Sequence, residues 1–167
     1  EKGEITNKFH TLINPETEIP IFITQLTGIS EAMVKDAPKF REIADDFLSF
    51  IGDAVLVAHN APFDIRFLNH EIGKIYDGYK VANPHLCTVQ LSRRLVPNIE
   101  NHKLNTVAEH FCVNLENHHR ASHDAHATAK IFVNLLEQLN DLGVSDLASA
   151  RKVKVWKESF IEKNFPF

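Results

Sequence analysis

The fold class is decided by the stretch Ala54-Val55-Leu56-Val57-Ala58-His59-Asn60-Ala61-Pro62-Phe63-Asp64. Residues 54–58 form a continuous apolar run that is too short for a helix, which predicts a strand buried on both faces in a sheet covered by helices. Polar residues follow at the carboxyl end of this strand, and residues 65–75 continue as a predicted helix. Because α/β sheets usually build their sites at the carboxyl ends of strands, the stretch predicts an α/β domain with a candidate site near Asp64.

A second informative stretch is His119-Arg120-Ala121-Ser122-His123-Asp124, which precedes a helical pattern. Ser122 is the predicted N-cap, which places Asp124 in the first turn, near the positive end of the helix. The apolar residues recur at three- and four-residue steps and predict the buried face; they are Ala125, Ala129, Phe132, Leu136 and Leu139.

His119 lies in the predicted loop before this helix, close to Asp124 in sequence. A fixed acid beside a mobile imidazole suits metal-assisted attack by water, in which the acid holds the ion and the histidine takes the proton. The alternative for these residues alone is a histidine-rich surface loop ahead of an ordinary core helix. Asp64 likewise has a structural alternative, as an acid that satisfies backbone N–H groups at the start of a helix.

The remaining pattern alternates short strands and helices. Residues 5–13 predict a strand, which is followed by an extended loop through residues 19–21. Helices are predicted over residues 31–35, from Pro38 through residue 51 with the proline in the first turn, over residues 89–95, and around residues 104–111. Residues 86–88 predict another strand, and residues 145–163 a weaker helix.

Composition limits the possible functions. The chain has 167 residues and a net charge of -4, so it is long enough for one domain with a real core but does not hold nucleic acid by overall charge. Any nucleic-acid role must therefore depend on a local site. No apolar run predicts a membrane span or a signal peptide, and Cys87 and Cys112 are expected to be reduced, which together predict a cytoplasmic protein.

Several segments together resemble a known family, the DEDDh or DnaQ-like 3′–5′ exonucleases. The run from Ala58 to Asp64 resembles the second motif of this family, and the run from His119 to Asp124 resembles its third motif, a histidine and an aspartate separated by four residues. Segments around residues 27–29, 37–40, 86–88 and 101–105 also fit. The resemblance covers residues 1–140 and extends to the exonucleases of PolC-type DNA polymerase III, the epsilon subunit and DinG-type proteins.

The resemblance implies an RNase H-like fold, a mixed sheet flanked by helices, and phosphodiester hydrolysis with two divalent metal ions, Mg²⁺ or Mn²⁺. Carried over by position, Asp64 and Asp124 are metal-binding catalytic carboxylates and His119 is the general base. His59, Asn60 and Phe63 are the predicted substrate-binding residues. For Phe63 and Asn60 the structural alternative, a strand-to-helix turn with a buried aromatic ring, is equally compatible with the sequence.

The sequence departs from the family in one important respect, because it contains no Asp-x-Glu, the first motif that supplies the other two carboxylates. Glu16-Thr17-Glu18 lies between prolines and not on an apolar strand. We therefore expect an exonuclease domain over residues 1–140 whose N-terminal strands are missing, followed by a helix or linker tail over residues 141–167. We also expect the chain alone to have little nuclease activity.

Two other functions stay open on the sequence. The first is a catalytically inactive exonuclease fold that serves as a binding or assembly module. The second is a zinc site formed by His118, His119, His123 and His126, which is disfavoured because no cysteine is near and a structural zinc ion needs four closed ligands. The predicted enzyme is expected to bind the 3′ end of single-stranded or frayed DNA, and RNA is an alternative substrate. Its expected protein partner is a DNA polymerase or a helicase, and no contact with a membrane is expected.

Overall fold

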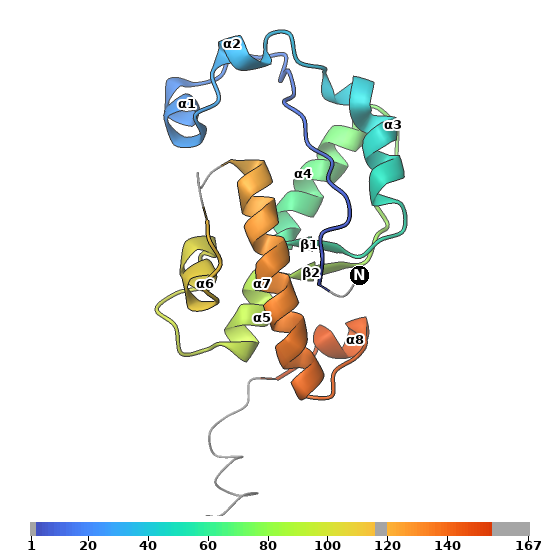
Figure 1. Ribbon diagram of the computed structural model, residues 1–167. Coiled ribbons are helices and arrows are strands. Elements are labelled where there is room, and N and C mark those ends of the chain that lie inside the picture. Colours follow the sequence, from blue (N-terminus) through green and yellow to red (C-terminus); the bar gives the residue numbers. More distant parts are fainter. Residues whose placement is uncertain (1–2, 116–119, 155–167) are drawn as a thin grey trace, which may run out of the picture.

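The computed structural model describes residues 3–115 and 120–154 (Figure 1). The chain follows one order of helices and strands: α1 (Ile21–Thr27), α2 (Glu31–Val34), α3 (Phe40–Ile51), β1 (Leu56–Ala58), α4 (Ala61–Gly73), β2 (His85–Cys87), α5 (Thr88–Leu95), α6 (Leu104–His110), α7 (Ala121–Asp141) and α8 (Leu147–Ala150).

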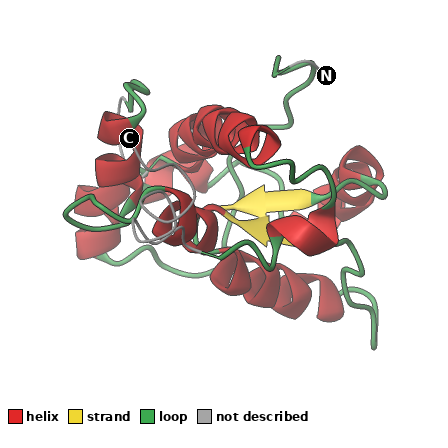
Figure 2. Ribbon diagram, turned by 90° about the horizontal axis from the view of Figure 1, so that it is seen from below, coloured by secondary structure: helices red, strands yellow, loops and turns green. Residues whose placement is uncertain are grey.

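The sheet consists of β1 and β2, which pair in parallel with Leu56 opposite His85 and Ala58 opposite Cys87. The helix α4 makes the crossover between them, as parallel pairing requires. Figure 2 shows the two strands side by side, with helices above and below. The predicted α/β class is therefore confirmed.

The prediction that the first strand is buried on both faces is wrong. All residues of β1 are half-buried, and Val55 just before it is 43% exposed. In the described part of the chain β1 has one partner strand, β2, so its other edge is not covered by a neighbouring strand. A continuous apolar run indicates a strand, but it does not show how completely the rest of the fold covers it.

The main hydrophobic core lies along α7, which packs against α5, α6 and β1. Its fully buried side chains come from three helices and fill the space beside the sheet; they are Leu91, Val107, Ile131, Leu135 and Leu139. A smaller cluster of Ile51, Ile72 and Val81 joins α3 to α4. The long helix α7 is therefore the element on which the rest of the fold is assembled.

The predicted buried face of α7 is right in part, since Leu139 is buried and Phe132 packs against the main core, but it is wrong at Ala125 and Leu136, which are exposed. The buried positions are Ala127, Thr128, Ile131, Leu135 and Leu139, whereas Leu136 is 38% exposed. The predicted N-cap is also displaced, because the helix is capped at Arg120 and Ser122 lies inside it. Asp124 nevertheless lies in the first turn, as the sequence predicted.

The predicted strand over residues 5–13 is absent from the structure. Figure 1 shows this segment running without a ladder partner between α7 and α3. Phe9 packs edge-on against Phe47 with ring centroids 5.9 Å apart, and Asn14 forms an isolated bridge with Lys39. Strand propensity is not sufficient when no described neighbour offers backbone partners.

The other differences concern where helices occur and where they begin. The segment predicted as an extended loop contains α1, which follows Pro20 and has no buried residue. The helix α4 begins at Ala61, earlier than expected, because Pro62 is tolerated in the first turn. Pro38 lies just outside α3, which is capped at Lys39. The weak C-terminal pattern yields α8, and the predicted helix beyond residue 154 lies outside the described residues.

None of the helices in the described part of the chain is long and apolar enough to cross a lipid bilayer.

Candidate active site

The turn after β1 sets the position of the first candidate acid. Asn60 adopts the left-handed conformation, with φ 78° and ψ 46°, and caps α4. Its carbonyl accepts a hydrogen bond from the Phe63 backbone N–H at 2.9 Å. Asparagine tolerates this conformation better than most residues, because its short polar side chain can bond locally. The chain therefore reverses sharply, and Asp64 falls in the first turn of α4.

Asp64 has solvent access, yet neighbouring protein atoms remove part of the water around its carboxyl group. This desolvation raises the pKa of Asp64 above its usual value, and a hydrogen bond from its own backbone N–H opposes the shift in part. Desolvation penalises the charged form of a carboxyl group, whereas a bound cation favours it. A cation bound beside Asp64 would therefore stabilise the charged form of its carboxyl group.

Asp124 is half-buried in the first turn of α7. At helical spacing it shares a face with Thr128 and Ile131, which are buried. This is the side of α7 that contributes to the core beside β1, and α4 starts directly after β1 and also contacts it. The structure therefore places Asp64 and Asp124 on two elements that pack against the same strand (Figure 1).

The start of α7 is also connected to α1. Arg120 donates a hydrogen bond from Nη2 to the Gly28 carbonyl at 3.2 Å. Gly28 ends α1 with φ 66°, and a Cβ atom there would lie 3.4 Å from the Arg120 guanidinium. A glycine suits this position because it adopts a positive φ without strain and leaves room for the arginine.

His59 uses both ring nitrogens for contacts with the protein. Nδ1 lies 2.9 Å from Thr88 Oγ1, and Nε2 lies 3.0 Å from the His102 carbonyl oxygen. Because a carbonyl only accepts, Nε2 carries a proton and donates it to that bond. His59 thus ties the carboxyl end of β1 to the start of α5 and to the segment before α6. The substrate-binding role of His59 stays a prediction, and these contacts fit a positioning role.

The hydrogen-bond network continues beyond His59. His102 Nδ1 lies 3.1 Å from Ser92 Oγ, which donates to the Val89 carbonyl, and burial together with Arg93 lowers the pKa of His102. Thr88, Ser92 and His102 were not predicted from the sequence as part of the site. The signals in the sequence were the position of Thr88 at the end of a predicted strand and the family resemblance of the segments around residues 86–88 and 101–105.

Replacing His59 by alanine is expected to lower the free energy of unfolding by about 1–3 kcal/mol, because Thr88 is fully buried and its hydroxyl loses a partner. Urea unfolding of the variant measures the loss. The control is His70→Ala, since the His70 side chain is 66% exposed on α4 and should change stability little. Equal stability of the two variants would show that the network contributes nothing.

Of the other predicted site residues, the structure describes Asn60 and Phe63 but not His119. Asn60 and Phe63 are both exposed, so a ligand can reach them, and the alternative of a buried aromatic ring is wrong for Phe63. His119, the predicted general base, lies outside the described residues. Its role stays a prediction.

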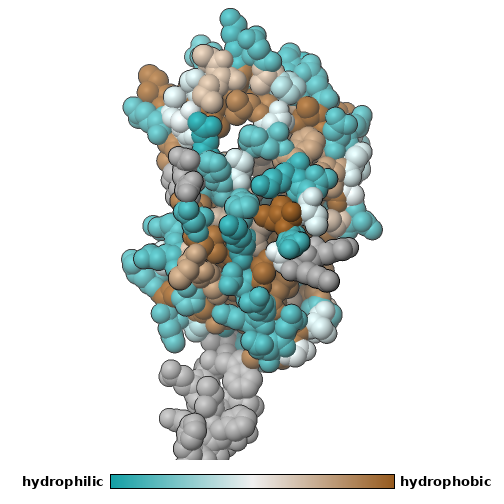
Figure 3. Space-filling view, viewed as in Figure 1, coloured by the Kyte–Doolittle hydropathy of each residue, from teal (hydrophilic) through white to brown (hydrophobic). Residues whose placement is uncertain are grey.

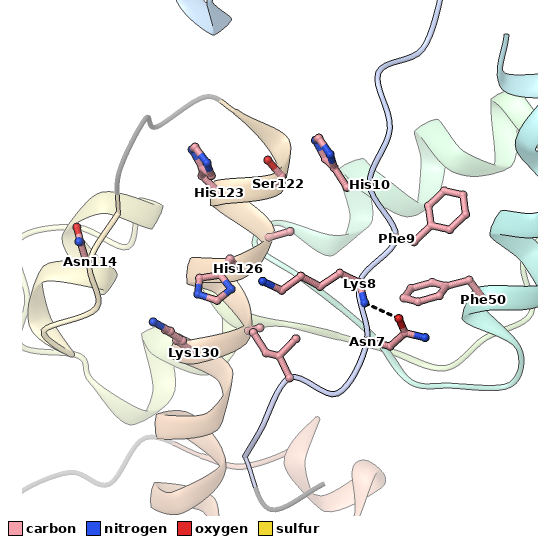
Figure 4. Close-up of a pocket in the computed structure, with 13 residues that line it drawn as sticks. Asn7, Lys8, Phe9, His10, Phe50, Asn114, Ser122, His123, His126 and Lys130 are labelled. Carbon is pink, nitrogen blue, oxygen red and sulfur yellow. Dashed lines mark hydrogen bonds between the residues drawn. The ribbon is translucent and has the colours of Figure 1, made fainter. Parts of the chain in front are cut away.

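A groove of about 680 Å³ lies on another side of α7, between this helix and the unpaired N-terminal segment. Figure 4 shows Lys8 extending from that segment toward His126, and the space-filling view in Figure 3 shows mainly hydrophilic residues along this face, with isolated hydrophobic ones among them. Neither Asp64 nor Asp124 lines the groove, and no acidic side chain of the described residues lines it. This groove is therefore separate from the candidate acids.

The groove also bears on the zinc alternative. His123 and His126 both line it, together with Lys8 and Lys130. Burial lowers the pKa of His126, and the nearby charges of Lys130, Lys8 and His123 lower it further. The surrounding lysines repel a divalent cation, so the positions of His123 and His126 do not support a zinc site. The other two histidines of the predicted zinc site, His118 and His119, lie outside the described residues.

The described residues do not complete a metal site. Within residues 3–115 and 120–154, no three His, Cys, Asp or Glu side chains come together as cation ligands. Asp64 and Asp124 offer the carboxylate oxygens that hard cations prefer, but two carboxylates are fewer than such a site needs. The donor set of the described chain therefore fits a catalytic metal centre only in part.

Comparison with known proteins identifies similar chains. Residues 1–132 match the family model of the RNase T type, described as an exonuclease. The chain is 45% identical over 160 residues to a PolC-type DNA polymerase III of Caldanaerobacter subterraneus, where the match covers 96% of this chain and 11% of the relative. It is 40% identical to the DNA polymerase III epsilon subunit of Aquifex aeolicus, covering 94% of this chain and 78% of that protein.

A solved structure is also similar. Exonuclease X, in complex with 5′ overhanging duplex DNA, matches with a TM-score of 0.66 and 27% sequence identity; the match covers 92% of this chain and 82% of that one. The chain spans about a tenth of the length of the PolC-type relatives that it matches.

Proposed function

This chain belongs to the exonuclease family, and from that membership we propose that it is the 3′–5′ exonuclease domain of a DNA replication or repair protein. The reaction is hydrolysis of the last phosphodiester bond of a strand: water attacks the phosphorus, and the bond to the 3′ oxygen of the preceding nucleotide breaks. The observation that carries this proposal is the placement of Asp64 and Asp124 on elements that pack against the same strand.

In this proposal, each candidate residue has one role. Asp64 and Asp124 would provide carboxylate ligands for the divalent ions, whose positive charge would offset that of the reacting phosphate. His119, outside the described residues, takes the proton of the attacking water. Asn60 and Phe63, both exposed at the start of α4, contact the terminal nucleotide, and the contacts of His59 hold the strand-to-helix turn in place.

Exonucleases of this family use divalent metal ions. We propose Mg²⁺ or Mn²⁺ at this site, two ions in all, because carboxylate oxygens are the ligands that these hard cations prefer. The described residues supply part of the ligand set, and the sequence contains no Asp-x-Glu to supply the rest. The prediction that the chain alone is impaired therefore stays open to experiment.

We propose single-stranded or frayed DNA as the substrate. Exonuclease X was solved with DNA, and the relatives named for DNA polymerase III act in DNA synthesis. A DNA polymerase is accordingly the proposed partner. RNA as a substrate, a helicase as a partner and a cytoplasmic location remain predictions from the sequence.

One observation favours a second function. The described residues hold no cluster of three metal ligands, and the sequence has no Asp-x-Glu motif. A chain with this composition can keep the fold and bind nucleic acid or a polymerase without cleaving, as an assembly module. Nucleic-acid binding without hydrolysis, even after an Asp-x-Glu strand is supplied, would favour this function.

The test compares the 167-residue chain with a version extended by a strand that carries Asp-x-Glu, both with Mn²⁺ and single-stranded DNA. We expect slow degradation by the chain alone and fast degradation by the extended protein. A 5′ label should then yield a ladder of shortened strands, whereas a 3′ label should be released at once as a mononucleotide. Rapid, Asp64-dependent degradation by the chain alone would contradict the expected impairment, and degradation from the 5′ end would contradict the function.

A further inference from the structure

Two phenylalanine rings stand side by side on the outer face of α4. Phe63 and Phe67 are stacked, with centroids 6.4 Å apart and planes inclined by 19°. Both are largely exposed, at 54% and 60%. Their spacing of four residues places them on one face of the helix, whereas the buried residues Ala61 and Ile72 mark the opposite face. An exposed aromatic pair of this kind indicates a surface for binding, since large apolar groups are stabilised by leaving water.

A cation accompanies the rings. The Arg66 guanidinium carbon lies 6.0 Å from the centre of the Phe63 ring, within the range of a cation–π contact. Asp64 occupies the adjoining side of the same helical turns, so the ring pair borders the candidate catalytic acid. Aromatic rings that stack on bases, next to a positive charge that faces phosphates, are the combination that binds single-stranded nucleic acid.

We propose that Phe63, Phe67 and Arg66 form a stacking platform for the unpaired bases of a single-stranded nucleic acid whose 3′ end reaches Asp64. The platform rests on the proposed function and adds Phe67 and Arg66 to it. The size of the patch favours this occupant over a protein. A stable protein interface buries about 800 Å² on each partner, whereas a base needs only a ring face.

The test measures binding in EDTA, so that no strand is cleaved. Fluorescence anisotropy of the 167-residue chain is compared for two labelled strands, an oligothymidylate of about twelve nucleotides and an abasic strand with the same number of phosphates. Phe67→Ala is expected to weaken binding of the oligothymidylate about tenfold and to leave binding of the abasic strand unchanged. Phe67→Trp should retain the wild-type preference for bases.

The matched control is Phe22→Ala, which removes another exposed ring, 65% accessible on α1, and should change neither affinity. If the wild type prefers the base-bearing strand and Phe67→Ala keeps that preference, the platform is wrong while the proposed function stands. If the wild type binds neither strand, the platform and the nucleic-acid function both fail. Because the Phe67 ring is exposed, circular dichroism should show the same fold for each variant.

Discussion

Replacing Asp64 by asparagine, in the protein extended with an Asp-x-Glu strand, is expected to lower the rate of hydrolysis of single-stranded DNA about a thousandfold. Asparagine keeps the shape of the side chain and removes its charge, so the proposed cation site loses a carboxylate ligand. Such a change corresponds to about 4 kcal/mol of transition-state stabilisation. Asp124→Asn should cause a loss of similar size. Initial rates of mononucleotide release at saturating Mn²⁺ measure both effects.

The matched control is Asp77→Asn, which neutralises an exposed acid beyond the end of α4 and should leave the rate unchanged. If the two acids act together, the double variant should hydrolyse DNA only slightly more slowly than either single variant. Asp64→Asn should be at least as stable as the wild type, since Asp64 has solvent access and desolvation penalises its charged form. Undiminished hydrolysis by the folded Asp64 and Asp124 variants would exclude both acids from catalysis.

The positions of the two acids in the fold were predictable because each is fixed by local sequence, whereas their catalytic role stays a prediction. Asp64 follows an apolar strand and a turn that contains Asn60, and Asp124 opens a helix; the structure places both in first turns. What the sequence did not reveal is the network that holds the turn. The contacts of His59 reach Thr88 and the His102 carbonyl, which lie 29 and 43 residues away. Such contacts depend on tertiary packing, and no local pattern reports them.

The fold was predicted where local pattern and packing agree. The strands at residues 56–58 and 85–87 and the helices α3, α5 and α6 appear close to their expected positions. The prediction failed over residues 5–13, where a strand-like segment has no ladder partner among the described residues. It also failed for α1, which has no buried residue, because a short helix without a buried face leaves no apolar periodicity in the sequence.

The error in α7 has a different origin. This helix carries apolar residues on two adjoining faces, and the face that contains Leu136 was predicted to be the buried one. The structure instead buries the face of Ile131 and Leu135 against α5, α6 and β1, while Ala125 and Ala129 line the groove beside the N-terminal segment. Periodicity alone gives both faces similar weight, so the surrounding elements decide which one forms the core.

Leu135→Ala is therefore expected to destabilise the protein by about 3 kcal/mol, because Leu135 is fully buried in the main core and its removal leaves a cavity. For a chain of this length the melting temperature should fall by roughly 10 °C. Leu136→Ala should cost less than about 1 kcal/mol, since Leu136 is 38% exposed. Thermal unfolding followed by circular dichroism measures both.

The pair is a matched comparison because both substitutions are chemically identical and occupy neighbouring positions in the middle of one helix. The change in helix propensity is the same for each and cancels in the difference. What remains is the difference in burial between the two faces of α7. If Leu136→Ala proved as destabilising as Leu135→Ala, the face chosen from periodicity would be part of the core, and the packing of α7 against β1, on which the placement of Asp124 depends, would have to be revised.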